Sequence, residues 1–413
     1  MPLVSLRHLH AFSAVAASGG IRRSAESLFR ASSAVARSVA ALEESLDVQL
    51  FERKGRGMLL TSAGETVRLR ADRIEAELRE VRDDALRMSG RNGEHTGGKV
   101  GGKVGGIEAL LNERRLQAAA LLAEVHYMPG VAHALDASQS AISQAITHLE
   151  NMLGQPLFLR TAHGMLPTDA GRRWIERFER VLAELRHIPE DIAALAGVVR
   201  GVVTIGALPL ARSQFLPLAI AAVQARHPHL VIRSLESPYD ELTAGLLSGR
   251  IDFILGALRP SMGVAFVSEP LFEDKVALVA RAGHPLAGQK RIAMRDLARY
   301  PWVLSRAGTP LRERFDRFFE GEGVVPPAPV VETGDLALAR GLLLSSDMLT
   351  ALSLHQLYHE IRAGQLVELR FALRGMERDI GITTRRGAHL SPGACALIED
   401  LQRLGATWSG KPQ

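Results

Sequence analysis

The sequence predicts a multi-domain fold in which two small helical units, each with a pair of short strands, precede one larger α/β domain. Two observations predict this class. A shift of 107 positions aligns Leu9 with Leu116 and residues 50–51 with residues 157–158, without a gap. After Arg200, amphipathic helices give way to short apolar runs that alternate with helices. A chain of 413 residues is long enough for several such domains, each with its own core.

The first copy of the repeat has the periodicity of three helices and a hairpin. Apolar residues spaced three and four apart predict amphipathic helices at 6–15 and 35–46, with a short helix at 25–29 between them. A short apolar strand, a polar turn and a return strand predict a two-stranded wing at 50–60. The second copy repeats this order 107 residues later. Each copy is therefore predicted to be a winged helix-turn-helix unit.

A longer, charged helix is predicted after each wing. Ser62 and Glu65 have the spacing of a capping box, which predicts a helix that starts there and continues to about Met88. Its counterpart is predicted to start near Asp169 and to end at Pro189, because proline interrupts helical hydrogen bonding.

The stretch GGKVGGKVGG at 97–106 separates the two copies. It belongs to a glycine-rich segment, residues 93–106, which we call the glycine tether. As a flexible coil, a tether of this length would have a root-mean-square span of about 20 Å. Because that reach suits a pair formed within one chain, we predict that helix 62–88 packs against helix 170–188 and that one chain presents two unequal heads.

The alternating pattern after residue 200 predicts an α/β domain. The apolar runs expected to form its first strands are 202–207, 230–235, 251–256 and 275–281. The predicted domains are thus a first unit at 1–92, the glycine tether at 93–106, a second unit at 107–195 and the α/β domain at 200–413.

Composition and motifs indicate the cellular compartment and the classes of function that the protein is not expected to have. The single cysteine, Cys395, excludes an internal disulfide framework, and the start MPLVSLRHLHAF lacks a signal peptide, so we expect a cytoplasmic protein. The most apolar long run, 336–354, contains Arg340 and Asp347, which argues against a membrane span. No motif supplies a catalytic set, metal ligands or a nucleotide-binding loop, so we expect no enzyme activity, no metal and no cofactor. Basic residues exceed acidic ones in residues 1–106.

The repeated unit resembles the DNA-binding domain of LysR-type transcriptional regulators. The resemblance runs along the whole of LRHLHAFSAVAASGGIRRSAESLFRASSAVARSVAALEESLDVQLFERKGRGMLLTSAGE in the first copy and is closer in ASQSAISQAITHLENMLGQPLFLR in the second. The second copy carries the family's Ser-Gln-x-Ala-Ile-Ser signature at 138–143, whereas the first copy has Ala31, Ser32, Ala34, Val35 and Ala36 at those positions. The resemblance implies that double-stranded DNA is a partner.

Short hydroxyl and amide side chains at the start of a helix allow close approach to the major groove and hydrogen bonding to bases. The DNA-binding candidates of the second copy are Ser138, Gln139, Ser140, Ser143, Gln144, Thr147 and Arg160. Those of the first copy are Ser32, Ser33, Arg37, Arg53, Lys54 and Arg56. Since the first wing is the more basic, we expect the first copy to contribute more backbone affinity and the second more sequence discrimination.

The segments RGVVTIGA, LPLAI, RHPHLVIRSLE, LLSGRIDFILG, GHPLA and PWVLS resemble the effector-binding domain of the same family. The resemblance implies the two-lobed fold of type II periplasmic solute-binding proteins, with lobe 1 at about 200–267 and 372–413 and lobe 2 at about 268–371. It also implies a small-molecule effector held partly at helix amino termini, where an anion is favoured. The effector-binding candidates are Leu208, Pro209, Ser213, Arg259, Arg306, Thr309, Pro310 and Thr333.

The family also implies a homo-oligomer, a dimer or tetramer, formed through the long helices and effector domains, with RNA polymerase as a further candidate partner. Two alternatives stay open at this point. The first copy could serve as a dimerisation or partner-docking module that does not bind DNA. The second half alone resembles a solute-binding transport protein, although the missing signal peptide and the two helix-turn-helix units argue against that class.

Overall fold

The computed structural model describes residues 4–54, 57–95, 104–259 and 263–408. The chain divides into two compact units, an N-terminal unit (Met1–Gly201 with Leu247–Arg250) and a C-terminal unit (Val202–Leu246 with Ile251–Gln413). Within the described ranges, no helix is long and apolar enough to cross a membrane.

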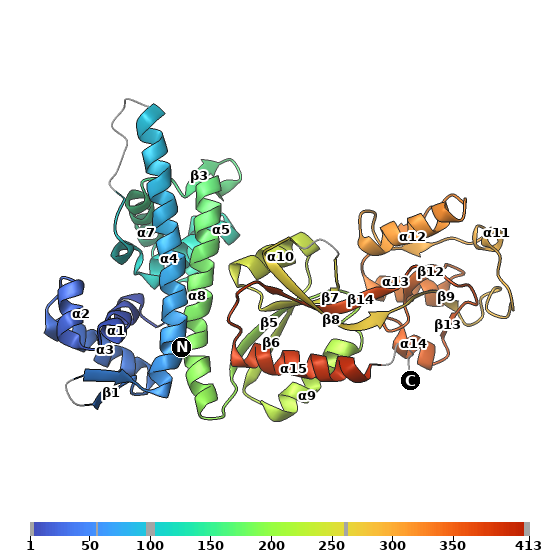
Figure 1. Cartoon of the computed structure of the whole chain (residues 1–413). Coiled ribbons are helices and arrows are strands. Elements are labelled where there is room, and N and C mark those ends of the chain that lie inside the picture. The colour runs from blue at the N-terminus through green and yellow to red at the C-terminus, as the bar shows by residue number, and fades with distance from the viewer. Residues whose placement is uncertain (1–3, 55–56, 96–103, 260–262, 409–413) are drawn as a thin grey trace. The chain divides into compact units, whose positions relative to one another are not determined.

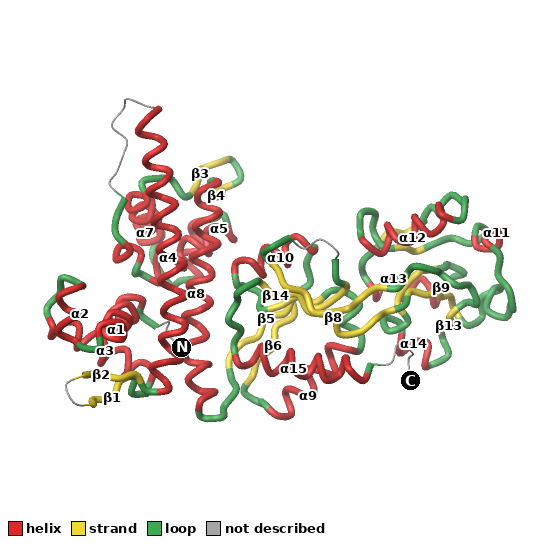
Figure 2. Tube along the Cα trace, in the orientation of Figure 1, coloured by secondary structure: helices red, strands yellow, loops and turns green. Residues whose placement is uncertain are grey.

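The N-terminal unit contains the same succession of elements twice. The first set comprises α1 (Leu6–Ser18), α2 (Ile21–Ser27), α3 (Ser32–Leu46), β1 (Phe51–Lys54), β2 (Gly57–Leu60) and α4 (Ser62–His95). After a short 3₁₀ helix, η1 (Ile107–Leu110), the second set comprises α5 (Glu113–Val125), α6 (Met128–Ala134), α7 (Gln139–Leu153), β3 (Phe158–Thr161), β4 (Gly164–Pro167) and α8 (Asp169–Leu195). A shift of 107 positions brings the bounds of each helix and strand into coincidence up to the start of the long helix. Apart from the two hairpins, β1 with β2 and β3 with β4, this unit is helical (Figure 2).

The repeat extends to individual backbone conformations. The left-handed conformation occurs at three equivalent pairs of positions, which are Gly19 and His126, Phe29 and Asp136, and Asp47 and Gly154. Equivalent hydrogen bonds also recur, since one oxygen of Glu43 accepts from the amide of Leu50 at 2.8 Å and one of Glu150 accepts from Leu157 at 2.8 Å.

The repeated T-x-A-G motif opens each long helix. The Thr61 hydroxyl accepts from the amide of Gly64 at 3.0 Å, and Thr168 does the same for Gly171 at 2.8 Å. The glycine is required because a Cβ at Gly64 would lie 2.1 Å from the carbonyl oxygen of Leu50. The residue that caps α4 is therefore Thr61, and the predicted capping box starting at Ser62 is wrong by one position.

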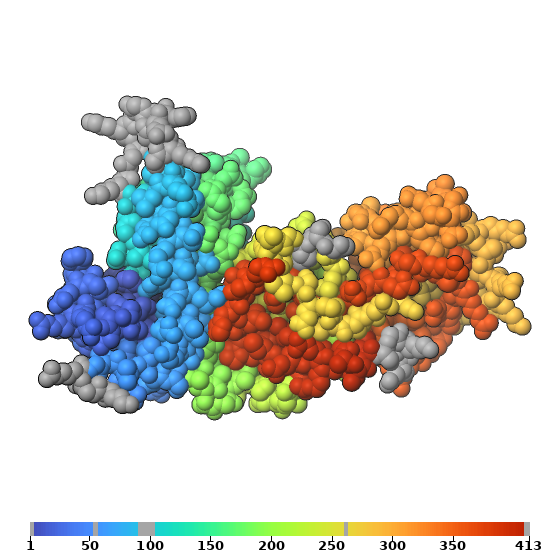
Figure 3. Space-filling view, viewed as in Figure 1, coloured from blue at the N-terminus to red at the C-terminus, as the bar shows by residue number. Residues whose placement is uncertain are grey.

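The two long helices, α4 and α8, lie side by side and antiparallel (Figure 1). Their surfaces are in direct contact in the space-filling view (Figure 3). Buried apolar residues alternate at spacings of four and three along each helix, as in a coiled coil. In α4 they are Val67, Ala71, Ile74, Leu78, Val81 and Ala85, and in α8 they are Trp174, Phe178, Val181, Leu185 and Ile188. We call this contact the α4/α8 seam, and it confirms the predicted pairing of helix 62–88 with helix 170–188.

Both long helices extend beyond their predicted ends. Helix α4 continues to His95, which takes it into the start of the expected tether, while residues 96–103 of that tether lie outside the described residues. Helix α8 passes through Pro189 to Leu195, so the predicted end at Pro189 is wrong. Proline removes one helical hydrogen bond, but Ile188 and Asp191 on either side of it are buried against α4, and their burial holds the helix together.

The C-terminal unit begins with a five-stranded sheet in the order β6-β5-β7-β14-β8. Its strands are β5 (Gly201–Ala207), β6 (Leu230–Leu235), β7 (Phe253–Ala257), β8 (Phe266–Asp274) and β14 (Arg378–Arg385). Three helices accompany this sheet, α9 (Phe215–Arg226), α10 (Tyr239–Ser248) and α15 (Pro392–Thr407). Strands β5 and β7 are parallel, whereas β14 is antiparallel to both β7 and β8.

A second part of this unit contains a three-stranded sheet, β12-β9-β13, and a parallel pair, β10 and β11. The strands are β9 (Val276–Arg281), β10 (Val303–Leu304), β11 (Val331–Glu332), β12 (Thr350–Ser353) and β13 (Leu366–Glu368). The helices are α11 (Met294–Leu297), α12 (Pro310–Gly321), α13 (Leu336–Ser345) and α14 (Tyr358–Arg362).

The chain crosses between the two parts later than the sequence predicts. Strand β8 pairs with β14 as far as Asp274, so the crossing follows Asp274 and does not occur near Ser268. The return likewise follows Met376 and does not occur near Phe371, because Leu373 and Met376 are still buried in the core of the second part. No sequence feature marks the residue at which a long β-strand leaves one sheet and approaches the next.

Candidate functional site

We call α3 and α7 the first and second reading helices, because they carry most of the predicted base-contacting residues. The second reading helix, α7, exposes a polar face. Ile142, Ile146, Leu149 and Leu153 are buried on the opposite side, which fixes the rotation of the helix. The predicted residues Gln139, Ser140, Ser143, Gln144 and Thr147 are all exposed. Ser138 caps the helix, because its hydroxyl accepts from the amide of Ala141 at 3.1 Å and also lies 2.9 Å from the Ser140 hydroxyl. The remaining hydroxyl and amide groups form a row that can donate to and accept from base edges.

The first reading helix, α3, is rotated in the same way but exposes different chemistry. Burial of Val35, Val39 and Leu42 turns Ser32, Ser33 and Arg37 outward, so the three predicted residues share one face. Within the described part of the chain, the residue at its N-cap, Ala31, makes no side-chain hydrogen bond to the helix. Helix α3 therefore starts without the cap that Ser138 supplies to α7.

The two hairpins carry the remaining DNA-binding candidates. Arg160 is exposed on β3, and the turn beyond it is held by Thr161, whose hydroxyl donates to the carbonyl of Gly164 at 3.0 Å and accepts from the amide of His163 at 3.1 Å. In the first hairpin, Arg53 and Lys54 lie in β1, and Arg56 lies outside the described residues.

Ion pairs across the α4/α8 seam repeat the internal symmetry of the chain. Arg70 pairs with Glu184 at 2.6 Å, and the equivalent residues of the other copy, Arg177 and Glu77, pair at 2.8 Å. Arg73 with Glu184 and Arg180 with Glu77 form a second equivalent set. The two copies are thus related by an approximate two-fold axis through the seam, the arrangement in which a dimer of identical chains would place its two heads.

The symmetry is incomplete at one pair of equivalent aspartates, Asp191 and Asp84, whose partners differ. Arg70 is fully buried and also holds Asp191, at 2.6 Å and 3.1 Å. Burial alone would lower the pKa of Arg70, but the bonds to Asp191 and Glu184 outweigh it and raise that pKa. Asp84, the counterpart of Asp191, instead accepts from the indole nitrogen of Trp174 at 2.8 Å.

In the C-terminal unit, four of the effector candidates gather after two parallel strands. Leu208 and Pro209 follow β5, and the amide of Leu208 donates to the carbonyl of Leu255 in β7 at 3.0 Å. Ser213 lies in the turn before α9, whose N-cap is Gln214. Arg259 follows β7 and stacks on the ring of Tyr239 at 3.4 Å, a partner that sequence reasoning missed.

The other four candidates follow the parallel pair β10 and β11. The Thr309 hydroxyl donates to the carbonyl of Arg306 at 2.7 Å and makes no capping hydrogen bond to α12, whose first residue is Pro310. The start of α12 therefore keeps backbone donors directed away from the helix. Thr333 accepts from the amide of Asp335 at 3.0 Å, while Asp335 itself caps α13. Each group of candidates thus lies at the carboxyl ends of parallel strands in one part of the unit, the usual place for a ligand.

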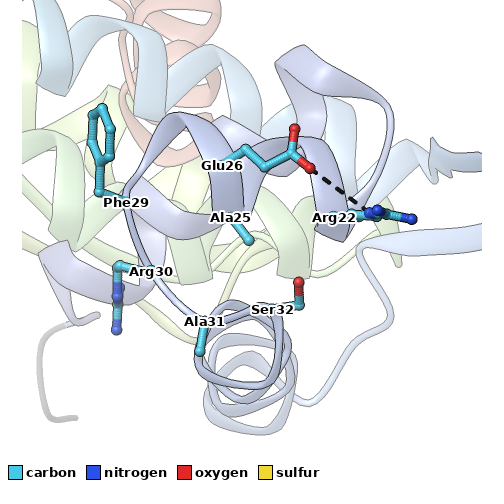
Figure 4. Close-up of a pocket in the computed structure, with 7 residues that line it drawn as sticks. All are labelled: Arg22, Ala25, Glu26, Phe29, Arg30, Ala31 and Ser32. Carbon is cyan, nitrogen blue, oxygen red and sulfur yellow. Dashed lines mark ion pairs between the residues drawn. The ribbon is translucent and has the colours of Figure 1, made fainter.

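Sequence reasoning missed a surface pocket on the first head. It has a volume of about 540 Å³ and lies where the turn between α2 and α3 meets the start of α3 (Figure 4). Its lining residues are Arg22, Ala25, Glu26, Phe29, Arg30, Ala31 and Ser32. Phe29 is 97% exposed, which no periodicity argument reveals, because an apolar residue next to a helix is ordinarily assigned to the core.

Comparison with known proteins identifies the family. The model for the LysR substrate-binding domain matches residues 196–406, and the model for bacterial regulatory helix-turn-helix proteins of the lysR family matches residues 6–65 and 114–172. The HTH-type transcriptional regulator GalR of Pseudomonas putida is 42% identical over 404 residues, 97% of this chain and 98% of that protein.

Solved structures show the same fold. A full-length OxyR variant from Pseudomonas aeruginosa superposes with a TM-score of 0.54 at 21% identity, covering 72% of this chain and 99% of that one. Full-length CbnR complexed with its target DNA superposes with a TM-score of 0.51 at 21% identity, covering 71% and 99%. The chain belongs to the LysR family of DNA-binding transcriptional regulators and carries the family's effector-binding domain in its C-terminal half.

Proposed function

We propose that both N-terminal copies of this regulator are winged helix-turn-helix domains and that one chain presents them together to duplex DNA. The α4/α8 seam carries this proposal, because it joins two equivalent heads through a buried, symmetric contact within a single chain. The reading residues are those of the exposed faces of α3 and α7, with the hairpins contributing cations to the phosphate backbone.

Footprinting with one reading helix disrupted at a time tests this proposal. Gln139→Ala with Gln144→Ala should abolish protection of one half of the site, and Ser33→Ala with Arg37→Ala should abolish protection of the other half. A matched control is Glu44→Ala, on an exposed position of α3 far from its start. Protection that responds only to the α7 variant would contradict the proposal and would favour a partner-docking role for the first copy.

The basic first hairpin is proposed to supply salt-sensitive affinity. Neutralising Lys54 and Arg56 to glutamine should weaken binding to all sequences alike and reduce the salt slope of log K by about 1.8, since each phosphate contact contributes about 0.9. The change His163→Gln in the second hairpin, which keeps Thr161 and its bonds across the turn, should leave the slope unaltered. An unchanged slope in the first variant would remove these residues from the phosphate-binding set.

For the C-terminal unit, we infer a two-lobed fold of the periplasmic-binding-protein type with an anionic effector between the lobes. The starts of α12 and α9, where the N-cap side chains of Thr309 and Gln214 make no capping hydrogen bond, support an anion site. A screen of carboxylated metabolites by thermal shift tests this, because a ligand at 100 times its dissociation constant stabilises the folded state by about 2.7 kcal/mol. Thr309→Val and Ser213→Ala should reduce the shift, whereas Thr407→Val, at the far end of α15, should not.

Several features follow from this assignment. We propose domains at 1–92, 107–195 and 200–413, joined by the glycine tether, and a regulator with no catalytic activity that works in the cytoplasm, where its DNA lies. Since the α4/α8 seam is already filled within the chain, further assembly to a dimer or tetramer would use the C-terminal units. RNA polymerase is the partner through which a DNA-bound regulator of this kind would act.

A further inference from the structure

The two heads differ in polarity at four equivalent positions on the reading helix and the turn before it, and the first head is the less polar at each of them. At each of them the second head has a hydroxyl or carboxylate, and the first head carries an apolar side chain. The equivalent pairs are Ser138 and Ala31, Ser143 and Ala36, Thr147 and Ala40, and Asp136 and Phe29. Ala31, Ala40 and Phe29 are exposed and Ala36 is half-buried, so this apolar character faces outward and does not serve the core.

Phe29 is the most exposed member of this face and adopts an unfavourable backbone conformation. Its φ is +51°, in the left-handed region that a bulky side chain rarely occupies, and its side chain is 97% exposed. The second head places Asp136 there, with φ +48°, a residue type that tolerates this region better. An aromatic ring held in a strained conformation without burial points to a contact made with another molecule.

Cations surround the apolar face of the first head. Arg22 and Arg30 line the pocket with Phe29 (Figure 4). Arg37 is exposed further along α3. The equivalent positions of the second head are Pro129, Ala137 and Gln144, none of them charged. Glu26 offsets Arg22 only through an exposed pair at 3.7 Å. A surface that combines apolar groups with a cationic border is complementary to a major groove, where phosphates flank the base edges.

We propose that the first head reads thymine methyl groups in the half-site that it occupies. Phe29, Ala36 and Ala40 contact the C5-methyl groups of thymines exposed in the major groove, and Arg30 and Arg37 hold the flanking phosphates. Apolar side chains identify thymine in this way, whereas the amides and hydroxyls of the second head read hydrogen-bonding edges. One chain therefore recognises two unlike half-sites by two different kinds of contact. This inference rests on the proposed function, in that both heads bind DNA.

Uracil substitution tests the inference, because deoxyuridine differs from thymidine only by the methyl group. The probe is a duplex selected from a random-sequence library with the full-length protein, with its two halves assigned to the two heads by footprinting. Replacing thymidine by deoxyuridine in the first head's half should weaken binding about fourfold for each contacted methyl, from the transfer free energy of one buried carbon. The same replacement in the other half should change binding less than about twofold, because hydrogen-bonding edges are unaltered. Replacing a contacted T·A pair by 5-methylcytosine·G, which keeps the methyl, should retain more affinity than replacing it by C·G.

The matched protein variant is Phe29→Asp, which installs the residue of the second head and suits the left-handed backbone. It should bind the unmodified duplex less tightly and lose the fourfold effect of uracil at the thymine that Phe29 contacts, while the effects at the thymines contacted by Ala36 and Ala40 remain. Two protected halves with no effect of uracil would overturn the inference while leaving the proposed function intact. Protection of a single half would instead overturn the proposed function. A Phe29→Asp variant with unchanged DNA binding and unchanged uracil sensitivity would also overturn the inference.

Discussion

Arg70 is the residue on which the α4/α8 seam depends most. It is fully buried and bonds to Glu184 at 2.6 Å and to Asp191 at 2.6 Å. Replacing it by methionine would fill the space but remove both bonds to the buried Asp191 and leave Glu184 with Arg73, and we expect the free energy of unfolding to fall by about 3 to 5 kcal/mol. Urea unfolding followed by circular dichroism measures this. Arg22→Met, which removes an exposed cation paired with Glu26, should change stability by less than about 1 kcal/mol. Equal effects of the two changes would mean that the buried bonds contribute no more than surface ones.

Exchanging the N-cap residue types of α3 and α7 should change the stability of the protein in opposite directions. Ser138 caps α7 through the amide of Ala141, whereas Ala31 offers α3 no side-chain acceptor. Ala31→Ser should therefore raise the free energy of unfolding by about 0.5 to 2 kcal/mol, and Ser138→Ala should lower it by a similar amount. The melting temperatures of the two variants should move in opposite directions, and movement in the same direction would contradict a capping role.

At the scale of the helix pair, Asp84 makes the seam sensitive to acid. Burial alone would raise the pKa of Asp84, but the bonds from Trp174 and Arg173 outweigh it and lower that pKa. A carboxyl whose pKa is lowered by folding contributes stability above its ordinary pKa, near about 4, and the contribution is lost as the pH falls through the folded-state value. We expect stability to fall below about pH 4 with a smaller slope in Asp84→Asn, measured by unfolding at stepped pH values. A variant with the full slope would show that other groups carry the acid sensitivity.

The elements could be predicted well from the sequence, but the contacts between them only in part. The repeat of 107 residues and the apolar spacing located α1, α3, α5 and α7, since local periodicity determines such helices. Helix α2 (Ile21–Ser27) begins four residues before the predicted 25–29, because its buried residues are only Ser24 and Ala25 and it has no apolar stripe. The alternation of four and three in α4 was also present in the sequence, yet its many charged residues concealed it. The continuation of α8 through Pro189 was not predictable, because the burial of Asp191 against Arg70 depends on a residue 121 positions away.

The candidate site residues could likewise be predicted where they depend on local apolar spacing, but not where they depend on contacts between elements. The exposed face of α7 followed from its apolar stripe, so Gln139 and Gln144 were identified together. The exposure of the Phe29 ring was not predicted, because it results from a left-handed turn between α2 and α3, which no pattern of apolar residues encodes. The stacking of Arg259 on Tyr239 was equally hidden, since it joins residues that follow different strands.

At the scale of the whole molecule, the α4/α8 seam joins the two copies of the repeat within a single chain. The two copies share a single continuous hydrophobic core, formed by α4, α8 and the helices packed on them. A contact made within one chain does not depend on protein concentration, because the covalent linkage keeps its two sides together at any dilution. DNA binding by the two heads should consequently stay bipartite at concentrations where the C-terminal units no longer associate.

Cutting the glycine tether tests whether the α4/α8 seam holds the two copies together without a covalent link between them. A protease site inserted between Gly98 and Lys99, outside the described residues, would divide the chain into a first head with α4 and a remainder that begins before η1. Because the seam buries a row of apolar side chains on each helix and the Arg70 bonds, we expect the two pieces to elute together at micromolar concentration and to separate on dilution or in Arg70→Met. Affinity for the bipartite duplex should then become dependent on concentration, while the uncut protein's affinity should not. Pieces that separate at once after cleavage, at a concentration where the uncut chain protects both half-sites, would show that the seam is too weak to hold the heads as a fixed pair.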